Sequence, residues 1–274
     1  MEKLQAALAR AREKRGDSEP VPARSPNQRN AKQTRLAEAT DDRWAALNAF
    51  DPSSKRLQQS LIFSGEASND AQHFDILRTK LLLEMRKHNW TRIAITSATP
   101  GSGKTTTVCN LIAGLVRQPE LRGILFDLDF RRPAVSKFFG VVPQATLEDV
   151  FAGNAQFSDQ ALRLGENTAI SMTPKAIKDP ARLLMHSRTS EVLDQIQADY
   201  QPDMMLFDLP PVLVSDESRA FFKLVDAVLI VASANANSVS EIDEVEREVA
   251  QYSNVAGIVL NKCRYMQDGY GYSY

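Results

Sequence analysis

The chain has 274 residues, of which 43% are hydrophobic and 24% charged, with a formal net charge of −1. These values describe an ordinary globular protein with one large domain and a tail, and the near-zero charge argues against a nucleic-acid partner. No apolar stretch approaches the roughly 20 residues that span a bilayer, and no secretory signal is present, so we expect a cytoplasmic location.

The N-terminal part, residues 1–60, is predicted to hold a basic helix and a mostly disordered linker. It carries 12 Lys/Arg against 8 Asp/Glu, whereas the remainder of the chain carries 21 against 26. Residues 1–15 have a thin apolar face at helical spacing, which favours a solvated helix over a docking or membrane-surface helix. Residues 16–60 are polar and rich in proline, apart from a possible short helical turn at Trp44, Leu47 and Phe50.

From about residue 68 the pattern is that of an α/β domain, which we assign to residues 61–264. An amphipathic helix carries Phe74, Leu77, Leu81 and Met85. Short apolar runs that read as strands then alternate with helical segments: 92–97, 123–129, 204–209, 227–232, 257–261 and, more weakly, 169–172. This alternation predicts a doubly wound, mostly parallel sheet with helices on both faces.

A phosphate-binding loop is predicted between the first of these strands and the helix that follows it. The segment Ala98–Thr105 reads ATPGSGKT, with Ala98 where the stricter motif has glycine. Glycines let successive backbone N–H groups face phosphate oxygens, Lys104 would reach the β- and γ-phosphates, and Thr105 would ligate Mg²⁺. A glycine-rich turn with an exposed lysine is the structural alternative. The predicted nucleotide-binding residues are Pro100, Gly101, Ser102, Gly103, Lys104, Thr105, Thr106 and, from the last strand, Asn261.

Two further strands end in carboxylates. The run GILFDLDF ends at Asp127 and Asp129, which alternation places on one face of the strand, and Arg131 follows. The run MMLFD delivers Asp208 in the manner of a Walker B strand. Ligands bind beyond the carboxyl ends of such strands, so these groups are candidates for binding metal and substrate, with helix capping as the alternative for the Asp127 region.

The chain ends in RYMQDGYGYSY, which places four of its six tyrosines within residues 265–274. These are Tyr265, Tyr270, Tyr272 and Tyr274. The segment has no core-forming period, so it reads as a flexible tail. From the residues alone, the tyrosines belong either to a disordered end or to an end that packs on a neighbour.

The motifs SATPGSGKTT, LFDLDFRRP and FDLPPVL, in this order, resemble the bacterial tyrosine kinase family. The resemblance covers about residues 68–274 and implies an ATP- and Mg²⁺-dependent P-loop autokinase. It implies catalytic roles for Lys104, Asp127, Asp129, Arg131 and Asp208. Thr105, Asp127 and Asp208 would serve the metal, and one of Asp127 and Asp129 would activate the tyrosine. The C-terminal tyrosines would be the sites of phosphorylation.

The resemblance also implies a role in polymerisation and export of capsular or extracellular polysaccharide. It implies a membrane chain-length regulator as activator, self-association, a cognate phosphatase and a peripheral position at the inner face of the plasma membrane. At the positions of the family's ring-forming Glu-x2-Arg-x2-Arg motif this chain has Gln72, Asp75 and Arg78.

Two other functions are considered. One is a dimerising ATPase switch of the partition or division-site type, although Thr99 stands where those proteins have a signature lysine. The other is an ATP-binding scaffold without catalytic activity.

Overall fold

The computed structural model describes residues 37–62 and 69–263. The chain divides after Asp41 into two compact units. Of the first unit only residues 37–41, which are helical, are described. The predicted basic helix of residues 1–15 and the tyrosine-rich tail of residues 265–274 lie outside the described residues.

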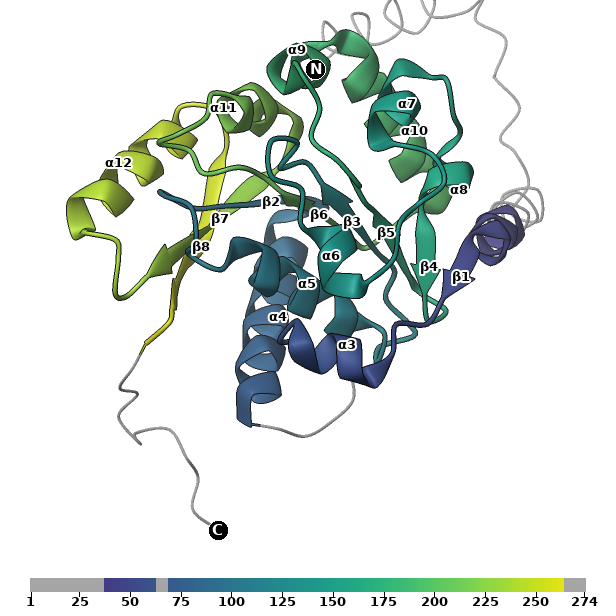
Figure 1. The fold of residues 1–274 in the computed structure, drawn as a ribbon, viewed down its shortest axis with the longest axis horizontal. Coiled ribbons are helices and arrows are strands. Elements are labelled where there is room, and N and C mark those ends of the chain that lie inside the picture. Colours follow the sequence, from purple (N-terminus) through teal and green to yellow (C-terminus); the bar gives the residue numbers. More distant parts are fainter. Residues whose placement is uncertain (1–36, 63–68, 264–274) are drawn as a thin grey trace, which may run out of the picture. The chain divides into compact units, whose positions relative to one another are not determined.

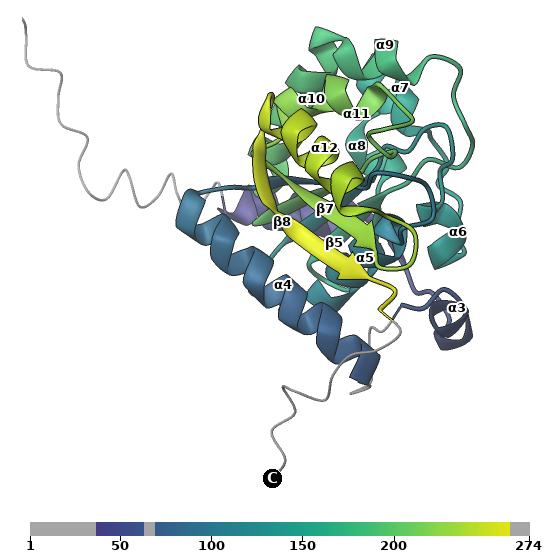
Figure 2. The same cartoon turned by 90° about the vertical axis from the view of Figure 1, so that its left-hand side faces the viewer.

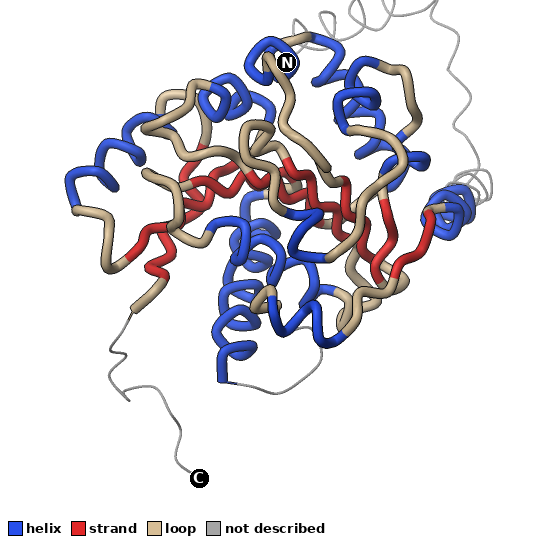
Figure 3. The backbone as a smooth tube through the Cα atoms, viewed as in Figure 1, coloured by secondary structure: helices blue, strands red, loops and turns tan. Residues whose placement is uncertain are grey.

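The second unit is built on one eight-stranded sheet with the order β1-β4-β5-β3-β6-β2-β7-β8. Figure 3 shows the strands as a band between helices. All neighbouring pairs are parallel except β4 and β5, so β1 and β4 run opposite to the other six strands. The strands are β1 (Asn48–Phe50), β2 (Arg92–Thr96), β3 (Gly123–Asp127), β4 (Leu162–Leu164), β5 (Thr168–Ser171), β6 (Met204–Asp208), β7 (Ala227–Ser233) and β8 (Asn254–Asn261).

Helices cover both faces of this sheet, as Figures 1 and 2 show. One face holds α3 (Ser54–Gln59), α4 (Asn69–His88), α5 (Lys104–Leu115) and α6 (Val135–Phe139). The other holds α7 (Leu147–Ala152), α8 (Phe157–Gln160), α9 (Pro180–Met185), α10 (Ser187–Tyr200), α11 (Glu217–Phe221), a 3₁₀ turn η1 (Phe222–Leu224) and α12 (Val239–Ala250). A separate apolar core lies on each side of the sheet.

The predicted doubly wound, mostly parallel sheet is therefore confirmed. All six predicted strands are present, because long apolar runs that can be buried on both faces favour central parallel strands. The amphipathic helix predicted from residue 68 is α4. None of the helices within residues 37–62 and 69–263 is both long and apolar enough to cross a bilayer.

The prediction of a mostly disordered linker is wrong for residues 42–60, although Trp44 does lie in a helix and is packed, as predicted. Instead of a disordered linker, this segment forms the end of a helix, then β1 and then α3. Trp44 is 2% exposed and its Nε1 donates a hydrogen bond of 2.8 Å to the carbonyl of Tyr200. Phe50 lies in β1, which pairs with β4, and not in a helical turn. A few apolar residues suffice here because the sheet edge and α10 provide the surface that buries them.

Candidate active site

The predicted phosphate loop lies between β2 and the N-terminus of α5. Gly101 and Gly103 both adopt positive φ, at 82° and 91°. A side chain at Gly103 would also collide with the amide of Asn261. Both positions therefore need glycine, and the loop brings its backbone to the first turn of a helix whose N–H groups attract anions.

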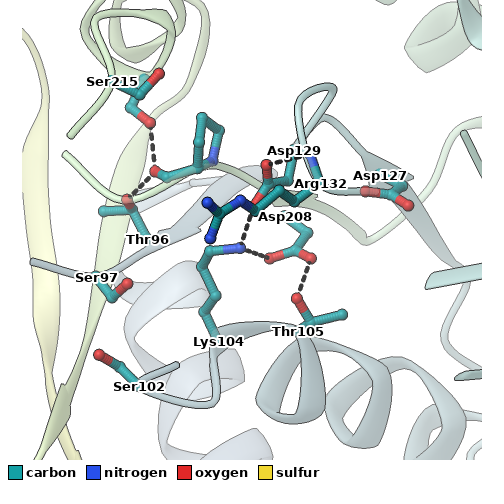
Figure 4. Close-up of polar contacts among 12 residues, drawn as sticks. Thr96, Ser97, Ser102, Lys104, Thr105, Asp127, Asp129, Arg132, Asp208 and Ser215 are labelled. Carbon is teal, nitrogen blue, oxygen red and sulfur yellow. Dashed lines mark hydrogen bonds and ion pairs between the residues drawn. The ribbon is translucent and has the colours of Figure 1, made fainter. Parts of the chain in front are cut away.

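Lys104, the first residue of α5, is buried at the centre of the site (Figure 4). Its Nζ lies 2.6 Å from Oδ2 of Asp129 and 3.6 Å from Oδ1 of Asp208. Burial alone would lower the pKa of Lys104, but Asp208 and Asp129 outweigh that effect, so its pKa is raised. Lys104 is therefore a charged ammonium group and not the exposed lysine of a simple turn.

Strands β3 and β6 are neighbours in the sheet, and Asp127 is paired in register with Asp208 at their carboxyl ends. The hydroxyl of Thr105 donates a hydrogen bond of 2.7 Å to Oδ2 of Asp208. Oδ2 of Asp127 accepts a hydrogen bond of 3.1 Å from the backbone N–H of Val135. Oδ1 of each carboxylate is buried and accepts no hydrogen bond.

These surroundings raise the pKa values of both carboxyl groups. Burial is the main cause for Asp127, the charge of Asp208 adds to it, and the Val135 N–H opposes it. Burial also dominates for Asp208, against the opposing effects of Lys104 and Thr105. A buried carboxylate without a full set of partners is costly, which makes the pair a suitable place for a cation.

The residues present fit Mg²⁺ held together with nucleotide phosphates. Oxygen ligands suit this ion, and one or two carboxylates suffice when phosphates complete its coordination. Asp127, Asp208 and Thr105 supply such oxygens. Within the described residues, no group of three or more His, Cys, Asp or Glu side chains forms a self-contained metal site.

Asp129 lies beyond the end of β3, so the alternation argument for its position is wrong. The strand ends at Asp127, and Asp129 begins a turn closed by a hydrogen bond from the N–H of Arg132 to its carbonyl. The turn nevertheless brings Asp129 to Lys104. The two aspartates therefore have different partners: Lys104 for Asp129, and the backbone of α6 for Asp127.

Arg131 is at the rim of this region. Its Nε donates a hydrogen bond of 2.5 Å to Oε1 of Glu217, and its side chain is 58% exposed. Glu217 lies outside every motif used in the sequence analysis. Only its position a few residues after the strand that ends at Asp208 could have indicated that Glu217 belongs to the site.

The phosphate loop has further partners that the motif does not predict. The side chain of Asn237 donates to Oγ1 of Thr99 at 2.9 Å and accepts from the hydroxyl of Ser102 at 3.2 Å. Nζ of Lys262 donates to the carbonyl of Gly101 at 2.6 Å. Asn237 follows β7 and Lys262 follows β8. Ligands bind beyond the carboxyl ends of such strands, and this was the one feature of the sequence that could have indicated these two residues.

Asn261 lies beside the loop, where its Nδ2 donates a hydrogen bond of 2.9 Å to the carbonyl of Ser102. A cavity of about 560 Å³ is lined by Gly103, Thr106 and Asn261 together with Phe74 and Leu77 of α4. Contact of Asn261 with the nucleotide base stays a prediction.

Of the predicted site residues, only Tyr265, Tyr270, Tyr272 and Tyr274 lie outside the described chain.

Residues 93–268 match the model of the CobQ/CobB/MinD/ParA nucleotide binding domain family. The chain belongs to this family. Members of the CobQ/CobB/MinD/ParA family are defined by a nucleotide-binding domain, which agrees with the phosphate loop described above.

Several curated relatives of this chain are named as tyrosine kinases. The chain is 30% identical over 202 residues to AmsA of Erwinia amylovora, a candidate tyrosine-protein kinase, in a match covering 72% of this chain and 27% of AmsA. It is 25% identical to the tyrosine-protein kinase YwqD of Bacillus subtilis, over 75% of this chain and 87% of YwqD. The chain thus spans about a quarter of the length of the first curated relatives and most of the length of YwqD.

The solved kinase domain of the Escherichia coli tyrosine kinase Etk has a similar structure. The TM-score is 0.67 at 26% identity, and the match covers 76% of this chain and 82% of that domain. These comparisons confirm the resemblance to bacterial tyrosine kinases.

Proposed function

We propose that this protein is a tyrosine autokinase that transfers the γ-phosphoryl group of ATP to tyrosines of its own C-terminal tail. The observation that carries the proposal is the cluster of Lys104, Thr105, Asp129 and Asp208, with Asp127 beside it. Phosphoryl transfer depends mainly on positioning and charge neutralisation, and these residues supply both kinds of charge at the end of a phosphate loop.

Asp127, Asp208 and Thr105 would hold Mg²⁺. When bound, the ion neutralises phosphate charge and orients the transferring group. Each of the two carboxylates has one buried oxygen that accepts no hydrogen bond, which supports this assignment.

Asp129 is the better candidate to accept the proton of the tyrosine hydroxyl. Its nearest charged partner is Lys104. Phosphates compete for the ammonium group of Lys104, and an Asp129 relieved of this partner is a carboxylate available as a base. The tyrosine oxygen forms the new bond to the γ-phosphorus, the bond to the β-phosphate oxygen breaks, and ADP leaves.

The position of the end of β8 supports the tail as the acceptor. Strand β8 ends at Asn261 beside the phosphate loop, and Lys262 contacts Gly101. Tyr265 follows only three residues later. Transfer between copies of the chain would require self-association. Arg78, at a ring-motif position, is buried and pairs with Asp75 of its own helix.

The resemblance supports a biological setting for this activity. The kinase would regulate polymerisation and export of capsular or extracellular polysaccharide at the inner face of the plasma membrane. A membrane chain-length regulator would activate it, and a cognate phosphatase would reverse it.

The test is incubation of the purified protein with Mg²⁺–ATP, with and without the cytoplasmic peptide of the regulator, followed by mapping of phosphotyrosine by mass spectrometry. We expect phosphate on the tail tyrosines that is lost in Lys104→Met. Lys80→Met, which removes an exposed lysine of α4, serves as the matched control. ATP hydrolysis without phosphotyrosine would favour the ATPase switch, and binding without either would favour the scaffold.

A further inference from the structure

A buried glutamate lies next to the proposed site and belongs to none of its motifs. Glu217 begins α11, and its side chain is 1% exposed. One carboxylate oxygen accepts the hydrogen bond from Nε of Arg131, and the other accepts one from the hydroxyl of Ser215. The contact between Glu217 and Arg131 joins the loop after β6 to the loop after β3.

Burying a carboxylate is unfavourable unless a cation and hydrogen bonds compensate for the lost water. Arg131 is the only cation that contacts Glu217 within the described chain. This pairing uses a single nitrogen of the guanidinium group. Neither terminal nitrogen of Arg131 donates a hydrogen bond to a described residue. Nη2 forms a long ion pair of 4.0 Å with Oδ1 of Asp216, an exposed carboxylate.

Arg131 is therefore held by its inner nitrogen while its outer nitrogens stay available. A planar guanidinium group with two free terminal nitrogens matches the oxygens of a phosphoryl group. The turn that carries Arg131 also carries Asp129, the partner of Lys104. A fixed Arg131 thus stands on the same short loop as the proposed base.

We propose that Glu217 is a positioning residue: it fixes the guanidinium group of Arg131 so that its terminal nitrogens bind the transferring phosphoryl group. This inference deepens the proposed function and rests on it for the identity of the reaction. Glu217 itself touches no reacting atom in this scheme, and it acts only through Arg131.

The test compares binding of ADP with binding of ADP–aluminium fluoride, which mimics the transferring phosphoryl group, in the full-length protein with Mg²⁺. Glu217→Gln keeps the shape of the side chain and removes its charge. We expect its affinity for the mimic to fall on the order of tenfold, with affinity for ADP unchanged, since only the mimic occupies the position that Arg131 serves. Glu244→Gln, which makes the same change at an exposed glutamate of α12, should change neither.

A double-mutant cycle then separates positioning from a general structural role. In an Arg131→Ala background, Glu217→Gln should cause no further loss of affinity for the mimic, because its effect passes through Arg131. Glu217→Asp should restore part of the affinity that Glu217→Gln loses. Losses that add in the double variant, or equal losses for ADP and the mimic, would overturn the proposal.

This binding assay is independent of tyrosine transfer. If the wild-type protein makes no phosphotyrosine but the cycle shows coupling, the autokinase proposal fails and the role of Glu217 toward a phosphoryl group stands. If phosphotyrosine forms and the cycle shows no coupling, the role of Glu217 fails alone. Thermal unfolding of each variant identifies any loss of affinity caused by misfolding.

Discussion

Buried polar side chains occur in two regions of the sheet, and their partners differ. Near β5, Gln160 is fully buried, its amide nitrogen donates to the carbonyl of Met172 at 2.7 Å, and its oxygen accepts from Ser171 at 2.5 Å. At the ends of β3 and β6, Asp127 and Asp208 are equally buried, yet each keeps one oxygen without a hydrogen bond.

This difference distinguishes buried polar side chains that stabilise the fold from buried polar side chains that are available to bind a ligand. A buried group whose hydrogen bonds are complete fixes the packing around it, as Gln160 does between α8 and β5. A buried carboxylate with an unused oxygen has a free-energy cost that a ligand can remove. The two regions should therefore respond in opposite ways to substitution and to pH.

The largest effect is expected for Asp127→Asn. Loss of this carboxylate should reduce tail phosphorylation by about 10²–10³-fold, because the charge that would hold Mg²⁺ is gone. It should weaken the binding of Mg²⁺–ATP but not of ATP in the presence of excess chelator. Both are measured by phosphotyrosine quantification and titration calorimetry. Asp243→Asn, on the exposed side of α12, is the control, and equal activity in the two variants would contradict the assignment.

Gln160→Ala should act on stability and not on activity. It leaves the Ser171 hydroxyl and the Met172 carbonyl without partners, at a cost of about 1–3 kcal/mol in the free energy of unfolding. Urea denaturation measures this loss, and the remaining folded protein should bind nucleotide normally. An unchanged denaturation midpoint together with weakened ATP binding would remove the distinction between the two regions.

The smallest effect is a pH dependence of stability. The raised pKa values of Asp127 and Asp208 mean that the folded protein holds protons that the unfolded chain has already released. The stability of the ligand-free protein should therefore decrease as pH rises above the ordinary carboxyl range, and the decrease should end above the raised values. As the pH is raised from about 4 to about 8, the melting temperature of Asp127→Asn should fall less than that of Gln160→Ala. Parallel curves would show that Asp127 does not carry the effect.

The sequence predicts the central part of the fold because the information there is local. Each predicted strand is an apolar run of several residues, and the phosphate loop is contiguous from Ala98 to Thr105. Strands β1 and β4 were not predicted, since each has three residues and one of them, Leu162–Leu164, contains an arginine. Strand β1 forms by pairing with β4 across more than a hundred residues, and β4 pairs in addition with the neighbouring β5.

The same limit applies within the site. Lys104, Asp127 and Asp208 could be predicted because strand ends of a parallel sheet meet at one edge. The contacts of Arg131 with Glu217 and of Thr99 with Asn237 join residues 86 and 138 positions apart. No spacing or periodicity encodes such pairs. They depend on how the loops after β3, β6 and β7 pack.

The strand order has a consequence for how the protein can be controlled. The second unit enters the sheet at β1 and leaves it at β8, and these strands form opposite edges. Seven strand spacings of about 4.8 Å put the two edges roughly 34 Å apart. A partner that engages the chain at the β1 edge would leave the β8 edge, with Lys262 and the start of the tail, open to a second molecule. If the proposed function holds, recruitment by a partner and phosphorylation of the tail would use separate edges of this sheet.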